Sequence, residues 1–335
     1  MNVMTIAVDT MGGDLGPSAA VEGVFRAAKR YPYLRLMMVG PEDILAEEMR
    51  KHEKNAGISI LHAPEVIDPS ETPTTAIREK KESSIVKGLR AVKNGDAQGF
   101  VSAGSTGALL TGATVIIGRR PGIERPALGT LLPTHTNPKD SRRGFVLLMD
   151  CGANMDCKPS YLTQFGELGA EYMKKTMGIE NPRVGLINVG TEEEKGNAAA
   201  KEAYALMKEA GYNFVGNIEG REIPSGTVDV AICDGFTGNI LLKFTEGFAK
   251  AMMGMIKEEL MSATLSKIGA LMATGAFKKL KTRFDYREVG GAPFLGLKSI
   301  VIKAHGSSDA LAFMNAIRQC VEFNETEETA WNSKK

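Results

Sequence analysis

The chain has 335 residues, of which 43% are hydrophobic, and its formal net charge is +1. This length and apolar content predict one large α/β domain or two smaller ones with a buried core, and the near-neutral charge argues against a nucleic-acid-binding protein. The four cysteines lack C-x-x-C spacing, which predicts a reducing, cytosolic location, and the sequence shows neither a signal peptide nor the roughly 18-residue apolar run of a membrane helix.

Short apolar segments alternate with helical patterns along the whole chain. The segments predicted to be strands are residues 5–8, 34–39, 58–62, 100–101, 144–149, 184–189, 228–233 and 299–303. Apolar residues three and four apart predict helices between them, and residues 119–143, rich in Arg and Pro, are expected to form a polar connection. The alternation predicts a mostly parallel sheet with helices on both faces, in a single large domain over residues 1–335 that has one or two lobes.

Residues 100–118 carry a strand, a loop of small residues and an apolar helix pattern in direct succession. Such a turn directs backbone N–H groups and the positive end of the helix dipole at one point, which suits an anion and above all phosphate. The hydroxyl groups of Ser105 and Thr106 add further donors. Taken alone, the loop also fits a tight strand-to-helix turn that binds nothing.

Six loops of this kind follow predicted strands, at residues 9–14, 102–107, 150–154, 190–197, 234–239 and 304–308. Because ligands bind at the carboxyl ends of the strands in parallel sheets, we expect these loops to form one phosphate-binding site of an enzyme. The candidate binding residues are Gly12, Gly13, Asp14, Ser102, Gly104, Ser105, Thr106, Gly107, Asn154, Asn188, Gly190, Asn197, Asp234, Thr237, Gly238, Lys303, Gly306 and Ser307. The sequence has no dinucleotide fingerprint, P-loop or nucleophile elbow, and no H-E-x-x-H motif or cluster of Cys and His residues suggests zinc.

Residues 255–285 interrupt the alternation and are predicted to form an inserted amphipathic helical hairpin. Its apolar stripe is Met261, Leu265, Ile268 and Met272, followed after Gly275 by Phe277, Leu280 and Phe284. Its basic residues are Lys278, Lys279, Lys281 and Arg283. The hairpin fits packing against the core or a dimer interface, and it equally fits a basic helix on an anionic membrane surface.

The motifs together resemble the bacterial phosphate acyltransferase family, PlsX. The matching blocks are AVDTMGGD at 7–14, VSAGSTGA at 101–108, DCGAN at 150–154, INVGTEEEKGN at 187–197, GNIEGR at 216–221, CDGFTGN at 233–239 and AHGSS at 304–308. The resemblance implies a fold like those of the isocitrate and isopropylmalate dehydrogenases and the phosphotransacetylases. It implies transfer of a fatty acyl group from acyl carrier protein to inorganic phosphate, without a metal or redox cofactor. The acyl-phosphate would supply a membrane glycerol-3-phosphate acyltransferase, and the protein would be a cytoplasmic homodimer associated peripherally with the membrane.

This reaction suggests roles for particular residues. Lys195 and Lys303 would offset the charge of phosphate, His305 would donate to the developing oxyanion or the leaving sulfur, and Asn239 is a third catalytic candidate besides Lys195 and His305. Direct attack by phosphate is favoured over an acyl-enzyme on Cys151. The acidic carrier protein would dock either on the basic residues of the hairpin or on the pairs Arg119/Arg120 and Arg142/Arg143. A phosphotransacetylase acting on coenzyme A thioesters, a decarboxylating dehydrogenase and a non-enzymatic membrane scaffold are the alternatives.

Overall fold

Eleven strands in the described part of the chain form one sheet. A computed structural model describes residues 4–135, 144–283 and 285–332. The strands are β1 (Thr5–Asp9), β2 (Arg35–Gly40), β3 (Ile58–His62), β4 (Gly99–Ser102), β5 (Ala127–Pro133), β6 (Phe145–Met149), β7 (Val184–Asn188), β8 (Phe214–Glu219), β9 (Val230–Ile232), β10 (Ala292–Leu295) and β11 (Ile300–Lys303). Their order across the sheet is β3-β2-β1-β4-β11-β10-β5-β6-β9-β7-β8. The mostly parallel α/β sheet predicted from the alternation is confirmed.

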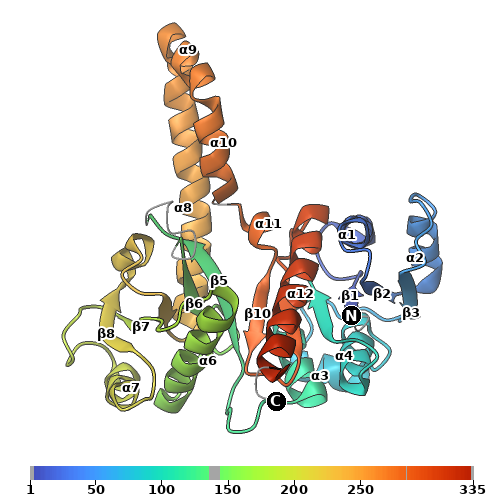
Figure 1. Ribbon diagram of the computed structural model, residues 1–335, viewed down its shortest axis with the longest axis horizontal. Helices are drawn as coiled ribbons and strands as arrows, with labels where there is room; N and C mark the ends of the chain where they lie inside the picture. Colours follow the sequence, from blue (N-terminus) through green and yellow to red (C-terminus); the bar gives the residue numbers. More distant parts are fainter. Residues whose placement is uncertain (1–3, 136–143, 284, 333–335) are drawn as a thin grey trace.

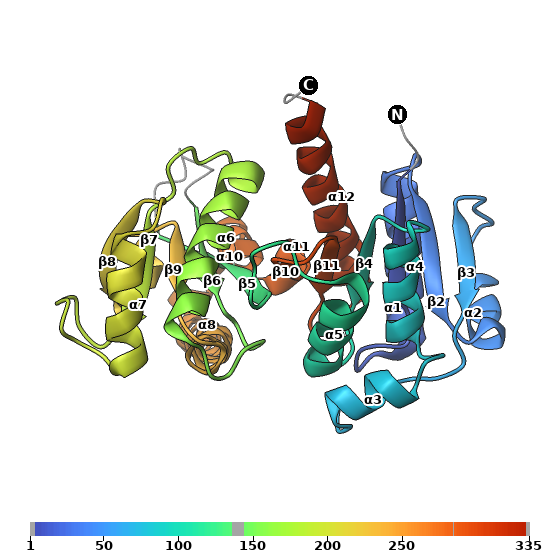
Figure 2. The same cartoon turned by 90° about the horizontal axis from the view of Figure 1, so that it is seen from below.

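The sheet has two parallel halves that run in opposite directions. In the first half, β1, β2, β3, β4 and β11 are parallel, and in the second half β6, β7, β8 and β9 are parallel. The antiparallel strands β10 and β5 join the halves through the pairs Phe294–Leu128 and Leu295–Ala127. Figures 1 and 2 show the halves side by side, with β5 and β10 between them. That these halves form a single domain stays a prediction.

Helices cover both faces of the sheet. They are α1 (Gly16–Arg30), α2 (Glu42–Met49), α3 (Pro73–Glu79), α4 (Ser84–Asn94), α5 (Thr106–Gly112), α6 (Pro159–Met177), α7 (Ala198–Lys208), α8 (Gly235–Ser262), α9 (Thr264–Met272), α10 (Thr274–Arg283), α11 (Tyr286–Val289) and α12 (Ala310–Asn332), with a π-helical turn at Ala113–Ile117 and a 3-10 helix at Gly220–Ser225. Strand β1 shows why both faces are covered, because its successive side chains point to opposite faces of the sheet. Ile6 and Val8 pack in one buried cluster with α1 and α12, and Ala7 packs in another with α4 and α5.

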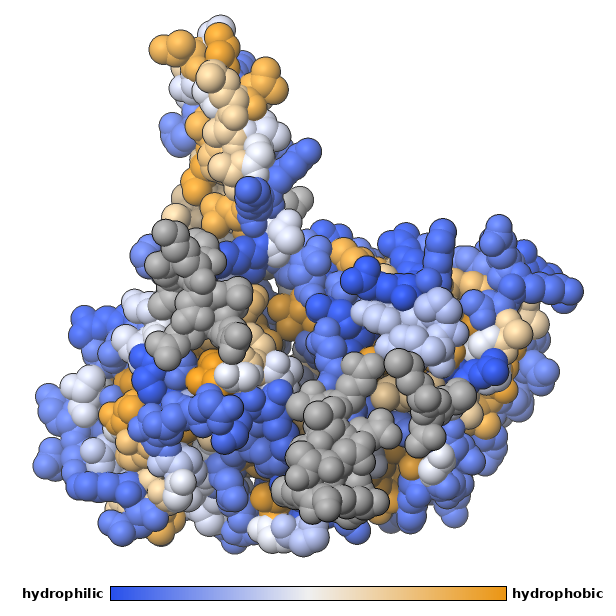
Figure 3. Space-filling model, in the orientation of Figure 1, coloured by the Kyte–Doolittle hydropathy of each residue, from blue (hydrophilic) through white to orange (hydrophobic). Residues whose placement is uncertain are grey.

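The segment predicted as an amphipathic hairpin projects from the second half as an arm formed by the end of α8 together with α9 and α10 (Figure 1). Apolar side chains gather at its far end (Figure 3), where Leu265 is 81% and Met272 is 85% exposed. None of the helices in the described ranges combines the length and the apolar content of a membrane span.

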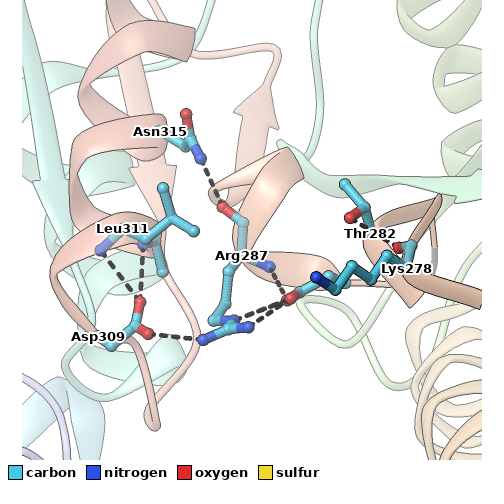
Figure 4. Close-up of polar contacts among 8 residues, drawn as sticks. Lys278, Thr282, Arg287, Asp309, Leu311 and Asn315 are labelled. Carbon is cyan, nitrogen blue, oxygen red and sulfur yellow. Dashed lines mark hydrogen bonds and ion pairs between the residues drawn. The ribbon is translucent and has the colours of Figure 1, made fainter. Parts of the chain in front are cut away.

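A short ion-pair network connects the base of the arm to the first half (Figure 4). The Arg287 guanidinium on α11 lies 2.9 Å from a carboxylate oxygen of Asp309, which precedes α12, and it also pairs with Asp285. Asp309 in turn accepts hydrogen bonds from the first backbone N–H groups of α12, at Leu311 and Ala312. The Asn315 side chain donates to the Arg287 carbonyl.

Three strands depart from the sequence expectation. Residues 119–143, expected to be a polar connection, contain β5, and no strand is predicted at β8 or β10. Strands β5 and β10 are bordered by Pro, Gly or Arg, and Gly216 interrupts β8, so none of the three has the sustained apolar run of the predicted strands. Arg142, Arg143 and Phe284 lie outside the described residues, as does the side chain of Lys281.

Candidate active site

A cavity of about 430 Å³ lies between the two halves of the sheet. Its walls come from the carboxyl end of β11, the start of β10, the strand β5, the loop after β6 and the first turns of α8. Among the predicted site residues, those that line it are Thr106, Asn239, Lys303, His305 and Gly306. The remaining walls are mainly apolar and include Leu131, Leu132 and Leu242.

Two loops of the first half are joined beneath this cavity by the buried carboxylate of Asp9. Asp9 Oδ2 accepts a 2.6 Å hydrogen bond from the Ser102 hydroxyl, and Oδ1 accepts from the N–H groups of Met11 and Gly12. Burial raises the pKa of Asp9, and these hydrogen bonds oppose the rise. Gly12 approaches the second loop so closely that a Cβ atom there would lie 2.4 Å from the Gly104 nitrogen.

The loop after β11 packs against the same two loops. The Asp14 N–H donates to the Gly306 carbonyl at 2.7 Å, and Gly13, with φ +105°, lies against the same carbonyl. The Lys303 ammonium group donates to the carbonyl oxygens of Ala103 and Ala304. Three of the six predicted loops therefore meet at one point, which is the convergence that the sequence predicts for them.

Lys303 and His305 are the ionisable groups of this loop that line the cavity. Burial lowers the pKa of Lys303 to about 8, against the opposing effect of the carboxylates of Asp9 and Asp14. The Nδ1 atom of His305 lies 2.8 Å from the Ser307 hydroxyl and accepts from the Ser307 N–H. The loop thus places a cation and an imidazole at the edge of one cavity.

The second half contributes the loop after β6 and the start of α8. Asp150 accepts hydrogen bonds from the N–H groups of Leu128 and Ala153 and from both the N–H and the side-chain amide of Asn154. Helix α8 starts against this loop, because the Gly235 N–H donates to the Asn154 carbonyl. At Gly238 a Cβ atom would lie 1.8 Å from the Asp150 carbonyl oxygen, so only glycine allows this approach.

Several predicted binding residues shape these helix starts rather than line the cavity. Ser105 caps α5 by accepting from the Ala108 N–H, and Asp234 caps α8 by accepting from the Thr237 N–H. A Cβ atom at Gly107 would meet Pro73 at 2.7 Å. These caps and close contacts order the loops and so bring Thr106 and Asn239 to the cavity. That Ser105, Gly107 and Asp234 bind phosphate directly stays a prediction.

One predicted loop lies elsewhere. The start of α7 is surrounded by Asn188, Gly190, Lys195 and Asn197. It lies beside the last two strands of the sheet, β7 and the edge strand β8 (Figure 2). Asn197 caps α7, and the Asn188 side chain donates to the Lys195 carbonyl. Lys195 is exposed there, and the structure does not place it with Lys303 and His305. Its catalytic role stays a prediction.

Glu246, Lys243 and Arg283 also line the cavity, although none was predicted there. Burial raises the pKa of Glu246, and the neighbouring His305 and Lys243 oppose the rise. Arg283, predicted to belong to a membrane or partner surface, donates to the Thr134 carbonyl. The Asp234 cap in the sequence indicates the helix that carries Lys243 and Glu246, which follow its start by about two and three turns, but it does not indicate their position at the cavity.

Cys151 lines the cavity but is buried, with its thiol 3.0 Å from the Leu148 carbonyl. Burial raises the pKa of this thiol well above its ordinary value, and the Asp150 charge adds to the rise. A thiol that stays protonated is a poor nucleophile. That phosphate attacks the thioester directly stays a prediction.

Comparison with known proteins places the chain in a family. The model of the family described as "Fatty acid synthesis protein" matches residues 4–330. The chain belongs to this family. Among the relatives of this chain, one named phosphate acyltransferase from Clostridium botulinum (strain ATCC 19397 / Type A) is 50% identical over 317 residues, covering 94% of this chain and 92% of the relative. Another of that name, from Clostridium novyi (strain NT), is 48% identical over 323 residues, covering 96% and 95%. The family resemblance read from the sequence motifs is confirmed.

Solved structures support the expected fold. A phosphotransacetylase from Streptococcus pyogenes is similar with a TM-score of 0.60 and 17% identity, over 96% of this chain and 94% of that one. A 4-hydroxythreonine-4-phosphate dehydrogenase from Salmonella typhimurium is similar with a TM-score of 0.54 and 13% identity, over 96% and 99%. At these identities the likeness establishes the fold of this chain, and its site must be argued from its own residues.

Proposed function

We propose that this protein transfers a fatty acyl group from acyl carrier protein to inorganic phosphate and releases acyl-phosphate. Family membership and the names of the relatives support acyl transfer to phosphate. The observation that carries the proposal is the composition of one cavity, which has Lys303 and His305 at one side and a wall of Leu131, Leu132 and Leu242 at another. A cation next to an apolar wall matches a reaction between an inorganic anion and an acyl chain.

The reaction needs few steps from the protein. A phosphate oxygen attacks the thioester carbonyl carbon, the C–S bond breaks, and the sulfur leaves with the bonding electrons. Phosphate is already an anion at neutral pH and a thiolate leaves readily, so the site has to position the reactants and stabilise the oxyanion. Lys303 offsets the charge of phosphate, His305 donates to the oxyanion or the departing sulfur, and the Asn239 amide supplies a further donor.

The arm is the part of the protein that we propose to associate with an anionic membrane surface. Leu265, Ile268 and Met272 are exposed at its far end, and the basic residues Lys278 and Lys279 follow on α10 (Figure 3). An exposed apolar tip next to lysines suits an interface between acyl chains and anionic headgroups. This association would bring acyl-phosphate close to a membrane acyltransferase that consumes it. We propose the same basic residues, with Arg119 and Arg120, as candidates for contact with the acidic carrier protein.

A second exposed apolar stripe supports the proposed homodimer. Phe236, Ile240, Phe244 and Phe248 lie four residues apart on α8 and are each more than half exposed, and the last two rings stack. Such a contiguous apolar stripe is typical of a protein interface. A second copy of α8 would cover it, so Phe244→Glu should reduce the molar mass measured by light scattering. An unchanged mass would place the dimer contact elsewhere.

The deciding experiment follows release of carrier thiol from palmitoyl-acyl carrier protein, with palmitoyl-coenzyme A in parallel. We expect release from the carrier protein that requires phosphate and yields acyl-phosphate. Release from coenzyme A alone would support a phosphotransacetylase instead. An absence of release from both thioesters would contradict acyl transfer to phosphate.

Flotation with anionic vesicles tests the arm. The double change Leu265→Glu and Ile268→Glu should release the protein from the vesicles, because it replaces apolar contacts with charges that the headgroups repel. Leu206→Glu, at a partly exposed leucine of α7, is the matched control. Equal flotation of both variants would contradict the membrane role of the arm.

A further inference from the structure

A second cavity, of about 540 Å³, lies at the opposite ends of the strands that form the candidate active site. Strand β11 reaches both cavities, because its carboxyl end, Lys303, lines the first and its amino end, Ile300, lines the second. Strand β10 also reaches both, with Ala292 at the first cavity and Phe294 at the second. We call the second space the rear cavity.

Both halves of the molecule contribute to the rear cavity. Leu168, Glu171 and Lys175 come from α6, which covers the second half, and Phe323 and Asn324 come from α12, which covers the first. Between these two helices, two backbone segments that contain Arg120 and Lys298 lie side by side. The Arg120 N–H donates to the Gly296 carbonyl, and the Lys298 N–H donates to the Gly118 carbonyl. A molecule bound there would contact both halves.

The charge of the rear cavity is unbalanced. Glu171 pairs through one oxygen with Arg120 and through the other with Lys175, both at 2.8 Å. Lys298 also lines the cavity and has no ion-pair partner within the described ranges, so it adds a positive charge that none of the described carboxylates neutralises. The excess of positive charge favours an anion.

The remaining walls combine apolar side chains with the polar side chains of Gln98, Ser299 and Asn324. Phe294, Leu297 and Ile300 form the buried side, and the aromatic rings of Tyr172 and Phe323 belong to the two flanking helices. The volume falls in the range of small-molecule sites. A ligand that satisfies both kinds of wall carries an anionic group and an apolar body.

From this geometry we propose that the rear cavity is a second ligand site for a small organic anion with an apolar body. The anionic group lies by Lys298 and Arg120, and the body lies against Phe294, Tyr172 and Phe323. Because the occupant contacts both halves, it stabilises their arrangement. The proposal rests on the cavity alone and does not depend on the reaction at the first site.

Titration of the full-length protein with 1-anilinonaphthalene-8-sulfonate, an apolar fluorescent anion, tests the site directly. We expect saturable binding that Lys298→Met and Arg120→Met each weaken by roughly three- to tenfold, since each removes one partly exposed charge contact. Lys93→Met, at an exposed lysine of α4 that does not line the cavity, is the matched control and should leave the affinity unchanged. Lys303→Met, which changes the first cavity, should leave binding of the probe to the rear cavity unchanged.

Two results would overturn the proposal. One is equal affinity of the Lys298→Met, Arg120→Met and Lys93→Met variants, and the other is loss of all probe binding in Lys303→Met, which would assign the probe to the first cavity. Thermal unfolding supplies a second measurement, because a ligand that binds only the folded state raises the Tm. The probe should raise the Tm of Lys93→Met more than that of Lys298→Met, and equal shifts would also contradict the site.

Discussion

The hydroxyl group of Ser102 donates a 2.6 Å hydrogen bond to the fully buried carboxylate of Asp9, and this contact joins the ends of β4 and β1. A buried acceptor that loses its partner keeps the cost of its desolvation, which is about 1–3 kcal/mol. We therefore expect Ser102→Ala to destabilise the protein by an amount in this range, measured from the midpoint of urea unfolding. Ser18→Ala, at an exposed serine of α1, is the control, and an equally small shift in both variants would contradict the role of this contact.

Gly12 is expected to be essential for a steric reason. A Cβ atom there would lie 2.4 Å from the Gly104 nitrogen, so Gly12→Ala must push the first two loops apart. We expect acyl transfer to fall at least tenfold, because catalysis depends on positioning within fractions of an ångström. Gly211→Ala, where a Cβ atom meets nothing within 4 Å, should keep its rate. Comparable rates in the two variants would show that the loop contact is not needed for catalysis.

The sequence was sufficient to predict the alternating strands and the loops of the first half. Asp14 lies far from Lys303 and Gly306 along the chain but meets them in space, because its loop follows β1 and theirs follows β11, and both strands lie in the same parallel half. The loop with Lys195 follows the same local pattern but lies beside the outer strands β7 and β8. The local sequence indicates that a strand is followed by a loop of small and polar residues, but it does not give the position of that strand in the sheet.

The junction of the halves was the least predictable part. Strands β5 and β10 are antiparallel to their neighbours, and this reverses the second half relative to the first. Long-range pairing rather than periodicity therefore decides these two strands. Glu246 reaches the cavity only because α8 starts against the Asp150 loop. The sequence therefore predicted the cation and imidazole of the site but not the apolar and acidic walls opposite them.

Lys303 gives the reaction an expected pH dependence. Burial lowers the pKa of its ammonium group to about 8, so the group is a cation below that pH and loses its charge as the pH rises through it. If its charge attracts phosphate, kcat/KM for phosphate should fall above pH 8. In Lys303→Arg the guanidinium stays charged throughout this range, so this fall should disappear. Profiles of the wild type and Lys303→Arg that decline together above pH 8 would assign the fall to another group.

Replacement of Cys151 distinguishes direct attack by phosphate from a covalent acyl-enzyme intermediate. Its buried thiol has a pKa raised well above the ordinary value and lies 3.0 Å from the Leu148 carbonyl, an acceptor that a serine hydroxyl also reaches. We expect Cys151→Ser to turn over within about twofold of the wild type, since a protonated buried thiol contributes little nucleophilicity. Mass spectrometry of the wild type quenched during turnover should show no acyl group on this residue. An acylated Cys151 peptide together with an inactive serine variant would establish a covalent intermediate instead.

Arg287 is expected to hold the base of the arm against the first half. Its guanidinium bridges Asp285, beside the end of α10, and Asp309, whose other oxygen caps α12, so Arg287→Ala removes the connection between two elements at once. Because the ion pairs are partly exposed, the global free energy of unfolding should fall by only about 1–2 kcal/mol. Amide hydrogen exchange in α10 and α11 should nevertheless rise clearly, since local opening there no longer has to break these contacts. Arg26→Ala, which removes an exposed pair with Glu22 on α1, is the matched control and should leave exchange in the arm unchanged. If both variants exchange alike in α10, the arm is held by its packing against α8 and α9, and the network at Arg287 only orders the start of α12.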